Sequence, residues 1–106
     1  MSLVINTGKI SLHLDSRAVE VGGQLLGLTA KEYRIFELLS LHKGQALSRA
    51  SLLDHLYPTA DQPYPRIINV FICHLRKKLS SATGGDSYIE TVYGRGYVLR
   101  DPSDRD

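Results

Sequence analysis

The chain has 106 residues, 42% of them hydrophobic and 23% charged, and a formal net charge of +2 at pH 7. This length suits one globular domain, and no apolar run approaches the ~20 residues that cross a bilayer, which excludes a membrane-spanning role. The single cysteine, Cys73, excludes an intrachain disulfide, and because residues 1–9 lack a signal-peptide pattern we expect a reducing, cytoplasmic compartment.

The first 28 residues predict an antiparallel sheet of three or four short strands. Apolar residues alternate at positions 10, 12 and 14, as in a strand with one buried face. A strand over 18–21 and its partner over 24–28 flank Gly22 and Gly23, a two-residue turn in which a positive φ costs little. Residues 3–6 are the candidate for the fourth strand.

A helix is predicted to begin at Ala30, because Thr29 and Glu32 have the spacing of a capping box. Its apolar residues cover more than half of the helix circumference, so we expect it at the centre of the core. Arg34 and Glu37 are left on a narrow solvent-facing stripe.

Two further helices follow. Residues 43–44, a lysine and a glycine, supply a cationic last turn and a stop for the first helix. Ser48 caps a second helix over 49–57, and a third helix runs over 66–82 and ends at Gly84.

The loop 58–65 between the second and third helices contains three prolines, which prevent regular structure. After the third helix, strands over 88–93 and 96–99 form a hairpin whose tip carries Arg95 between two glycines. We expect the folded domain to span residues 1–102 and residues 103–106 to form a polar tail.

The third helix has an unusual charge pattern. No Asp or Glu lies between positions 62 and 85, whereas a solvated helix usually pairs acids with bases four residues apart. One side of its helical wheel is apolar and predicted to face the core: Ile68, Phe71, Ile72, Leu75 and Leu79. The opposite side collects cations, an amide and small groups: Arg66, Asn69, Val70, Cys73, His74 and Lys77.

This composition predicts a helix that lies in the DNA major groove. Long cations reach phosphates, Asn can bond an adenine edge through two hydrogen bonds, and Val can pack on a thymine methyl group. Two successive helices followed by a hairpin indicate a helix-turn-helix variant with a wing, since the connection 58–65 exceeds the three or four residues of the simple motif. Arg95 at the hairpin tip is placed to enter the adjacent minor groove.

Five segments together resemble the OmpR/PhoB winged-helix effector domain of bacterial response regulators, and the resemblance covers residues 3–102. They are residues 28–33 (LTAKEY), 43–44 (KG), 52–53 (LL), 70–79 (VFICHLRKKL) and 91–97 (TVYGRGY). The resemblance implies an α+β winged helix-turn-helix fold with an N-terminal four-stranded antiparallel sheet, three helices and a C-terminal hairpin wing. It also implies sequence-specific binding of double-stranded DNA to regulate transcription in a two-component system.

Site residues carry over from this resemblance by position. Those that fall where family members meet bases or the sugar edges beside them are Asn69, Val70, Cys73 and His74. Those that fall where the family meets phosphates are Tyr57, Arg66, Arg76, Thr91 and Tyr97. Lys77 is added to the residues expected to meet phosphates because it lies in the same basic segment. Arg95 is assigned to the minor groove.

The resemblance implies partners as well. It predicts an upstream receiver domain, pairing of the protein on AT-rich direct-repeat half-sites, and a contact with RNA polymerase through the loop 58–65. A protein bound to the chromosome in this way is expected in the cytoplasm, associated with the nucleoid.

Other functions are disfavoured by the sequence. There is no G-x-S-x-G, phosphate-loop or H-E-x-x-H pattern, so we expect neither an enzyme nor a cofactor site. Cys73 and His74 are adjacent on one helix and lack the spacing of metal ligands, so no metal is expected. The alternative left open is a winged-helix module that binds protein without specific DNA binding, because a fold alone does not define its partner.

Overall fold

The computed structural model describes residues 3–102, and the predicted tail 103–106 lies outside the described residues. The elements are β1 (Val4–Thr7), β2 (Ile10–His13), β3 (Ala18–Val21), β4 (Gln24–Leu25), α1 (Ala30–Leu41), α2 (Arg49–Leu56), α3 (Ile67–Thr83), β5 (Ile89–Val92) and β6 (Gly96–Leu99). This order confirms the α+β architecture with a four-stranded antiparallel sheet, three helices and a C-terminal hairpin.

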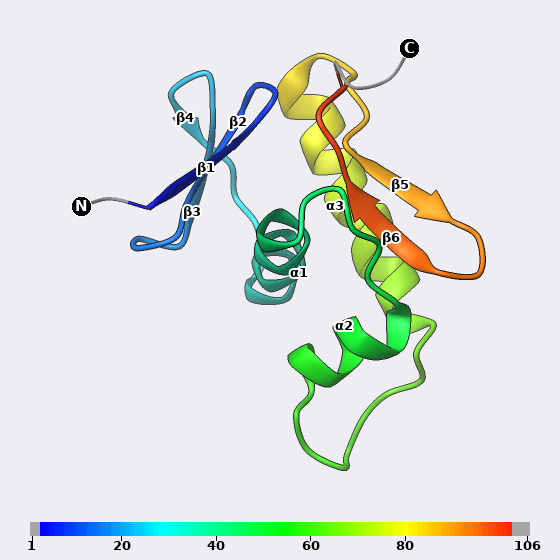
Figure 1. Ribbon diagram of the computed structural model, residues 1–106. Coiled ribbons are helices and arrows are strands. Elements are labelled where there is room, and N and C mark those ends of the chain that lie inside the picture. Colours follow the sequence, from blue (N-terminus) through cyan, green and yellow to red (C-terminus); the bar gives the residue numbers. More distant parts are fainter. Residues whose placement is uncertain (1–2, 103–106) are drawn as a thin grey trace.

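The helix α1 stands at the centre of the molecule. The sheet β1 to β4 lies on one side of it and α3 on the other, while the β5–β6 hairpin runs beside α3 and α2 lies at one end with the loop that follows it (Figure 1). The third helix is therefore held from the inside by α1 and flanked by the hairpin.

The N-terminal sheet is a meander in which each strand pairs with the next in the chain. The turn between β3 and β4 has φ of 59° at Gly22 and 82° at Gly23, the left-handed conformation expected for a two-residue hairpin turn. The predicted strand over 24–28 is too long, because β4 ends at Leu25. Leu26 N still donates to Val19 O at 2.8 Å, but Gly27 has no side chain to pack and the chain then turns into α1.

The capping box at the start of α1 is confirmed. Thr29 Oγ1 accepts a hydrogen bond from Glu32 N, and Glu32 Oε1 accepts one from Thr29 N at 2.9 Å. The solvent-facing position predicted for Glu37 is wrong, since this residue is only 9% exposed. Its carboxylate accepts from Tyr33 Oη at 3.1 Å and pairs with Arg34, so the acid is buried with its partners.

Lys43 has a different role from the one predicted. The helix α1 ends at Leu41, so Lys43 does not belong to its last turn. Its Nζ donates to Asn6 O at 2.8 Å and to Thr7 Oγ1 at 3.2 Å, and it pairs with Asp101 at 3.4 Å. This lysine thus joins the N-terminal sheet to the segment that follows β6.

The contact between α1 and α3 combines apolar burial with one ion pair. Fully buried side chains from both helices include Ile35 and Leu39 of α1 and Ile68, Ile72 and Leu75 of α3. Beside this core, Lys78 Nζ donates to Glu32 Oε1 at 2.6 Å. Burial alone raises the pKa of Glu32, but the hydrogen bonds from Lys78 and Thr29 outweigh it, so the pKa lies below the ordinary value of 4.5.

This pKa shift predicts how stability depends on pH. A carboxyl whose pKa is lowered in the folded state stabilises it above pH 4.5, and the contribution disappears as the pH falls through the lowered pKa. We expect Glu32→Gln to lower the free energy of unfolding by about 1–2 kcal/mol at pH 7, because Lys78 is partly exposed and screened. Urea denaturation at several pH values measures the difference in free energy of unfolding between the wild type and Glu32→Gln. This difference should become smaller below pH 4.5.

The matched control is Asp86→Asn, which removes the more exposed ion pair with Lys9 and should change stability by less than about 0.5 kcal/mol. A Glu32→Gln protein as stable as the wild type at pH 7, or a deficit that persists unchanged into acid, would contradict this account.

Candidate nucleic-acid interface

The two faces of α3 divide as the sequence predicts. Ile68, Ile72, Leu75 and Leu79 are buried, and Phe71 is partly buried against the same core. The opposite face is exposed along its whole length and consists of Arg66, Asn69, Val70, Cys73, His74 and Lys77. All four residues predicted to read bases, and two of those predicted to meet phosphates, therefore share one accessible surface.

The helix begins and ends one residue later than predicted, at Ile67 and Thr83. Arg66 precedes the first helical residue, and its carbonyl accepts from Asn69 N at 3.0 Å in a tight turn. Gly84 ends the helix with a φ of 79°, and its N–H donates to Ser80 O. The positive φ explains why a glycine stands there.

The hairpin tip projects beside the start of α3. Tyr93 is 93% exposed and Arg95 is exposed, while Arg95 N donates to Val92 O at 2.9 Å and closes the turn. The tip is anchored by a bridge that sequence reasoning missed, in which Leu47 N donates to Tyr97 O at 2.8 Å and Tyr97 N donates to Leu47 O at 2.9 Å. One antiparallel bridge thus joins the segment between α1 and α2 to strand β6 of the hairpin.

Gly96 makes this close approach possible. Its φ is 119°, and a Cβ atom at this position would lie 2.0 Å from Leu47 O. No side chain fits there without moving the backbone, so the glycine fixes how the wing sits on the domain.

Arg49 is a further exposed cation at this surface that sequence reasoning missed. A concavity of about 440 Å³ is lined by the first turn of α2, Pro65 and the hairpin tip from Gly94 to Gly96. Arg49 contributes to its wall and also to a neighbouring concavity of about 240 Å³ that Asn69 and Tyr97 line. Arg49 lies at the start of a helix far from the basic segment in sequence, so only the fold brings it to this surface.

Three residues predicted to meet phosphates form a cluster that joins α3 to the wing. Arg76 Nε donates to Ile89 O at 3.1 Å, and its terminal nitrogen donates to Thr91 Oγ1 at 2.9 Å. The guanidinium carbon also lies 5.5 Å from the centre of the Tyr97 ring. The positive charge of Arg76 is therefore held in place by the hairpin instead of extending freely into solvent.

Tyr97 also contacts the residue predicted to read bases at the start of α3. It is 8% exposed, and its Oη donates to Asn69 Oδ1 at 2.6 Å. The residues of the wing and of the recognition face are thus connected through one tyrosine. Nothing in the local sequence around either residue indicates this contact.

Tyr57 lies apart from this cluster, at the C-cap of α2. Its half-buried ring lies 4.4 Å from Lys31 Nζ, which also donates to Leu56 O at 3.3 Å. The loop 58–65 that follows is tied back by Gln62, whose Nε2 donates to Tyr57 O at 2.8 Å and to Asp54 Oδ1 at 2.9 Å.

The cations at this surface are not equivalent. Lys78 is paired with Glu32, whereas Arg49, Arg66, Lys77 and Arg95 have no acidic partner among residues 3–102.

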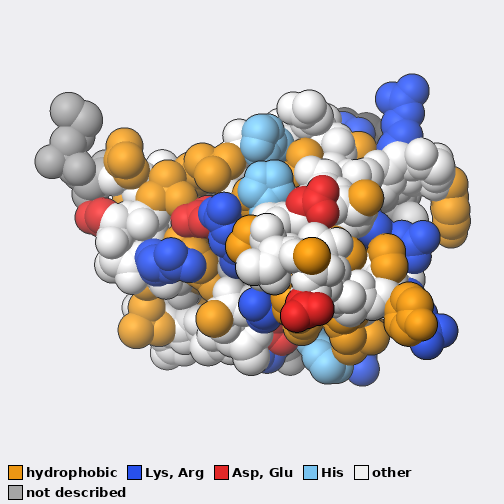
Figure 2. Space-filling view, turned by 90° about the horizontal axis from the view of Figure 1, so that it is seen from below, with side chains coloured by type: hydrophobic (Ala, Val, Ile, Leu, Met, Phe, Trp, Pro, Cys, Tyr) orange, Lys and Arg blue, Asp and Glu red, His pale blue; other side chains and the backbone are white. Residues whose placement is uncertain are grey.

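On the face seen in Figure 2, hydrophobic side chains are interspersed with polar and basic ones instead of forming one continuous patch. Val70, the one large hydrophobic residue of α3 that is exposed, is 45% exposed and has polar neighbours on the helix.

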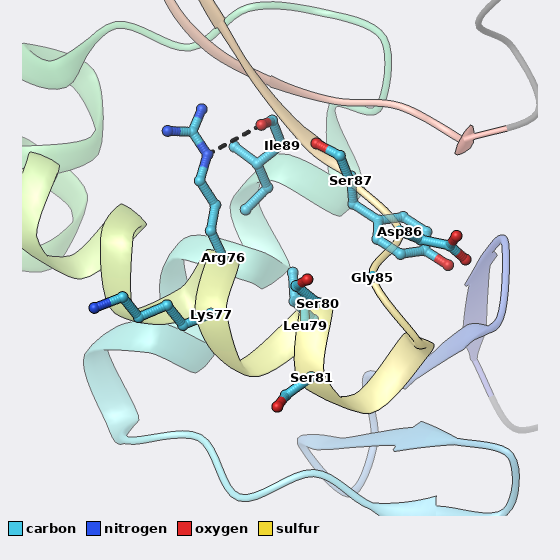
Figure 3. A pocket seen from close by; sticks show the side chains of 10 residues that line it. Arg76, Lys77, Leu79, Ser80, Ser81, Gly85, Asp86, Ser87 and Ile89 are labelled. Carbon is cyan, nitrogen blue, oxygen red and sulfur yellow. Dashed lines mark hydrogen bonds between the residues drawn. The ribbon is translucent and has the colours of Figure 1, made fainter.

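A separate groove of about 540 Å³ lies between the C-terminal half of α3 and the segment that leads into β5 (Figure 3). Arg76 and Lys77 border it, and the hydrogen bond from Arg76 to Ile89 closes one side. The carboxylate in this groove, Asp86, pairs with Lys9 at 3.2 Å. The groove therefore extends the basic side of α3 without adding an unpaired acid.

Within residues 3–102, no three His, Cys, Asp or Glu side chains gather as a metal site would require. In the same part of the chain, no helix has the length and apolar character needed to cross a membrane.

Comparison with known proteins identifies the family. The profile of the family described as "Transcriptional regulatory protein, C terminal" matches residues 23–99. The DNA-binding domain of CpxR from E. coli superposes with a TM-score of 0.80 at 29% identity, covering 95% of this chain and 99% of that one. The Klebsiella pneumoniae RstA DNA-binding domain, solved in complex with the RstA box, superposes with a TM-score of 0.77 at 28% identity, covering 92% and 97%.

The chain belongs to this family, the OmpR/PhoB-type winged-helix DNA-binding domains of transcriptional regulators, and the family is not one of enzymes. Within it, the chain is similar to the cell cycle response regulator CtrA of Brucella ovis, with 57% identity over 99 residues. The match covers 93% of this chain and 43% of CtrA, so the chain spans less than half the length of that relative.

The geometry of the wing predicts unequal effects of two glycine substitutions. Gly96→Ala places a methyl group against Leu47 O and should lower the free energy of unfolding by about 2–4 kcal/mol, because strain and a backbone clash combine. Gly94→Ala, at a φ of 80° with open space around it, should cost only about 1 kcal/mol. Chemical denaturation measures both, and equal losses would show that Leu47 does not constrain the wing.

Proposed function

We propose that this domain binds double-stranded DNA sequence-specifically, with α3 in the major groove and the hairpin tip, residues 93–97, at the adjacent minor groove. The observation that carries the proposal is the exposed face of α3, which has no acid and lies beside exposed Arg49 and Arg95. An α-helix fits the width of the major groove, and exposed cations on and beside it can hold phosphates of the DNA backbone.

The residues divide into two roles under this proposal. Asn69, Val70, Cys73 and His74 face the base edges because they occupy the exposed ridge of α3. The groups proposed to hold phosphates are Tyr57, Arg66, Arg76, Lys77 and Thr91, to which the fold adds Arg49. Tyr97, also predicted to meet a phosphate, is nearly buried, and its hydroxyl donates to Asn69. Phosphate contacts fix the register of the protein on DNA, and base contacts distinguish one sequence from another.

We further propose that the domain is the effector part of a longer response regulator. The match covers 43% of CtrA, a response regulator, which supports a longer protein with a receiver domain. Under this proposal, the receiver domain lies upstream, and its phosphorylation controls pairing on AT-rich direct-repeat half-sites. Such a regulator works on the nucleoid in the cytoplasm.

The loop 58–65 is the proposed contact with RNA polymerase. Tyr64 is 75% exposed on this loop, and the bonds of Gln62 hold the loop at the end of the molecule beside α2. A loop held in this way presents a defined surface next to the DNA-binding elements.

The competing function is a module that binds protein alone. It would need a contiguous exposed apolar surface, and Val70 is the one large hydrophobic side chain of α3 that is exposed. The exposed face of α3 therefore favours DNA.

Two substitutions on α3 separate base reading from phosphate binding. Asn69→Ala should weaken binding to the preferred site by about 1–3 kcal/mol and change binding to random DNA little, because it removes a base contact. Lys77→Ala should weaken binding to both and make the salt dependence shallower by about one unit. Fluorescence anisotropy with labelled duplexes at several salt concentrations measures both quantities.

Arg17→Ala is the matched control, since it removes an exposed cation that lies on the turn between β2 and β3 and has no acidic partner among residues 3–102. It should leave affinity and salt dependence unchanged. Equal losses of Asn69→Ala on preferred and random DNA would refute the base-reading role.

A further inference from the structure

The side chain of Asn69 is held from behind by the wing. Tyr97 Oη donates to Asn69 Oδ1 at 2.6 Å, across 28 positions in the chain. Tyr97 is almost completely buried, whereas Asn69 is exposed. An exposed residue on the proposed reading face thus has the oxygen of its amide bonded to a nearly buried tyrosine.

Tyr97 is itself firmly placed. Its backbone N–H and C=O both pair with Leu47, at 2.9 Å and 2.8 Å. Its ring lies against the guanidinium of Arg76, which is bonded in turn to Ile89 and Thr91. The hydroxyl that Asn69 meets therefore has a defined position before any DNA arrives, which is what a site held by supporting residues requires.

The hydrogen bond determines which part of the amide is available. An asparagine has an accepting oxygen and an –NH₂ group with two donors, and a free side chain can turn either one outward. Because Tyr97 occupies Oδ1, the Nδ2 group of this exposed residue is left to donate, and it has no hydrogen-bond partner among residues 3–102. In the major groove, guanine O6 and N7, adenine N7 and thymine O4 accept hydrogen bonds, whereas cytosine presents its N4 donor.

We propose that Tyr97 is a positioning residue that turns Asn69 so that its Nδ2 donates to an acceptor on the base edge. This inference rests on the proposed DNA binding and makes it more specific. The role differs from the phosphate contact predicted for Tyr97, because a lost phosphate contact weakens binding to every sequence and a lost positioning contact affects one base pair. Fixing the amide in advance also lowers the entropy cost of forming the base contact.

The test uses the preferred duplex, obtained by selection from a random library, and variants of it with each base pair changed in turn. Asn69→Ala identifies the base pair that Asn69 reads: it is the position at which the variant no longer distinguishes the preferred base pair from the others. Tyr97→Phe should reduce discrimination at that same base pair by about three- to tenfold, the effect of one hydrogen bond, and leave affinity for random DNA unchanged. In the Asn69→Ala background, Tyr97→Phe should have no further effect on discrimination.

Tyr57→Phe is the matched control, since it removes a phenol hydroxyl from a tyrosine at the C-cap of α2, which lies apart from this cluster and does not meet Asn69. It should leave discrimination at the Asn69 base pair intact. In the DNA-free protein, the Asn69 side-chain NH₂ signals in a ¹⁵N correlation spectrum should shift in Tyr97→Phe and stay in place in Tyr57→Phe.

Asn69→Asp provides a second variant that does not alter the buried tyrosine. It keeps an oxygen for Tyr97 and replaces the outward donor by an acceptor, so preference at this base pair should change toward a base that donates, such as cytosine.

Equal losses of Tyr97→Phe on specific and random DNA would overturn the positioning role in favour of a phosphate contact. Unchanged discrimination in Tyr97→Phe, or an unchanged base preference in Asn69→Asp, would also overturn it. A wild-type domain that prefers no sequence would instead refute the proposed function, and the inference with it.

Discussion

The packing of α3 against α1 is the constraint on which the rest of the structure depends. Ile68, Ile72 and Leu75 are buried against the core that α1 organises, and burial of such side chains is worth about 1.5–3 kcal/mol each. Because these residues recur on one side of the helix, they leave only one orientation in which the apolar side is covered. The same orientation exposes Asn69 and Lys77 on the opposite side, so the stability of the core and the direction of the candidate interface have one cause.

The wing is positioned by a second set of contacts, and these also determine what its residues can do. Leu47 pairs with Tyr97, and Gly96 allows the two backbones to approach. Arg76 donates hydrogen bonds to strand β5 of the hairpin. The recognition face and the wing are therefore joined by direct contacts, and Arg49 and Arg95, which have no acidic partner in the described part of the chain, lie beside them.

Local sequence signals predicted the elements well where a few neighbouring residues determine them. The capping box of Thr29 and Glu32, the turn at Gly22 and the acid-free segment that forms the exposed face of α3 all depend on residues close in the chain. The length of β4 could not be predicted, because it depends on where the chain must leave the sheet to enter α1. The burial of Glu37 escaped prediction because its partner Tyr33 is itself buried by tertiary packing.

The candidate site was predictable only in part. The residues of α3 that face outward follow from helical spacing, and the roles assigned to them in DNA binding stay predictions. Two features of the site depend on residues far apart in the chain, so no local pattern could indicate them. They are the contact between Tyr97 and Asn69 and the position of Arg49 beside the wing. Lys78 pairs with Glu32, which lies 46 positions away in the chain. The number of cations in the basic segment is therefore larger than the number available to a ligand.

The most direct test of the account is fluorescence anisotropy of the domain with two labelled duplexes, one of random sequence and one with AT-rich direct repeats, at several salt concentrations. We expect binding whose affinity falls steeply with salt, together with a clear preference for one duplex. Absence of binding to both duplexes at low salt would contradict the account and make a protein partner the better explanation of this fold.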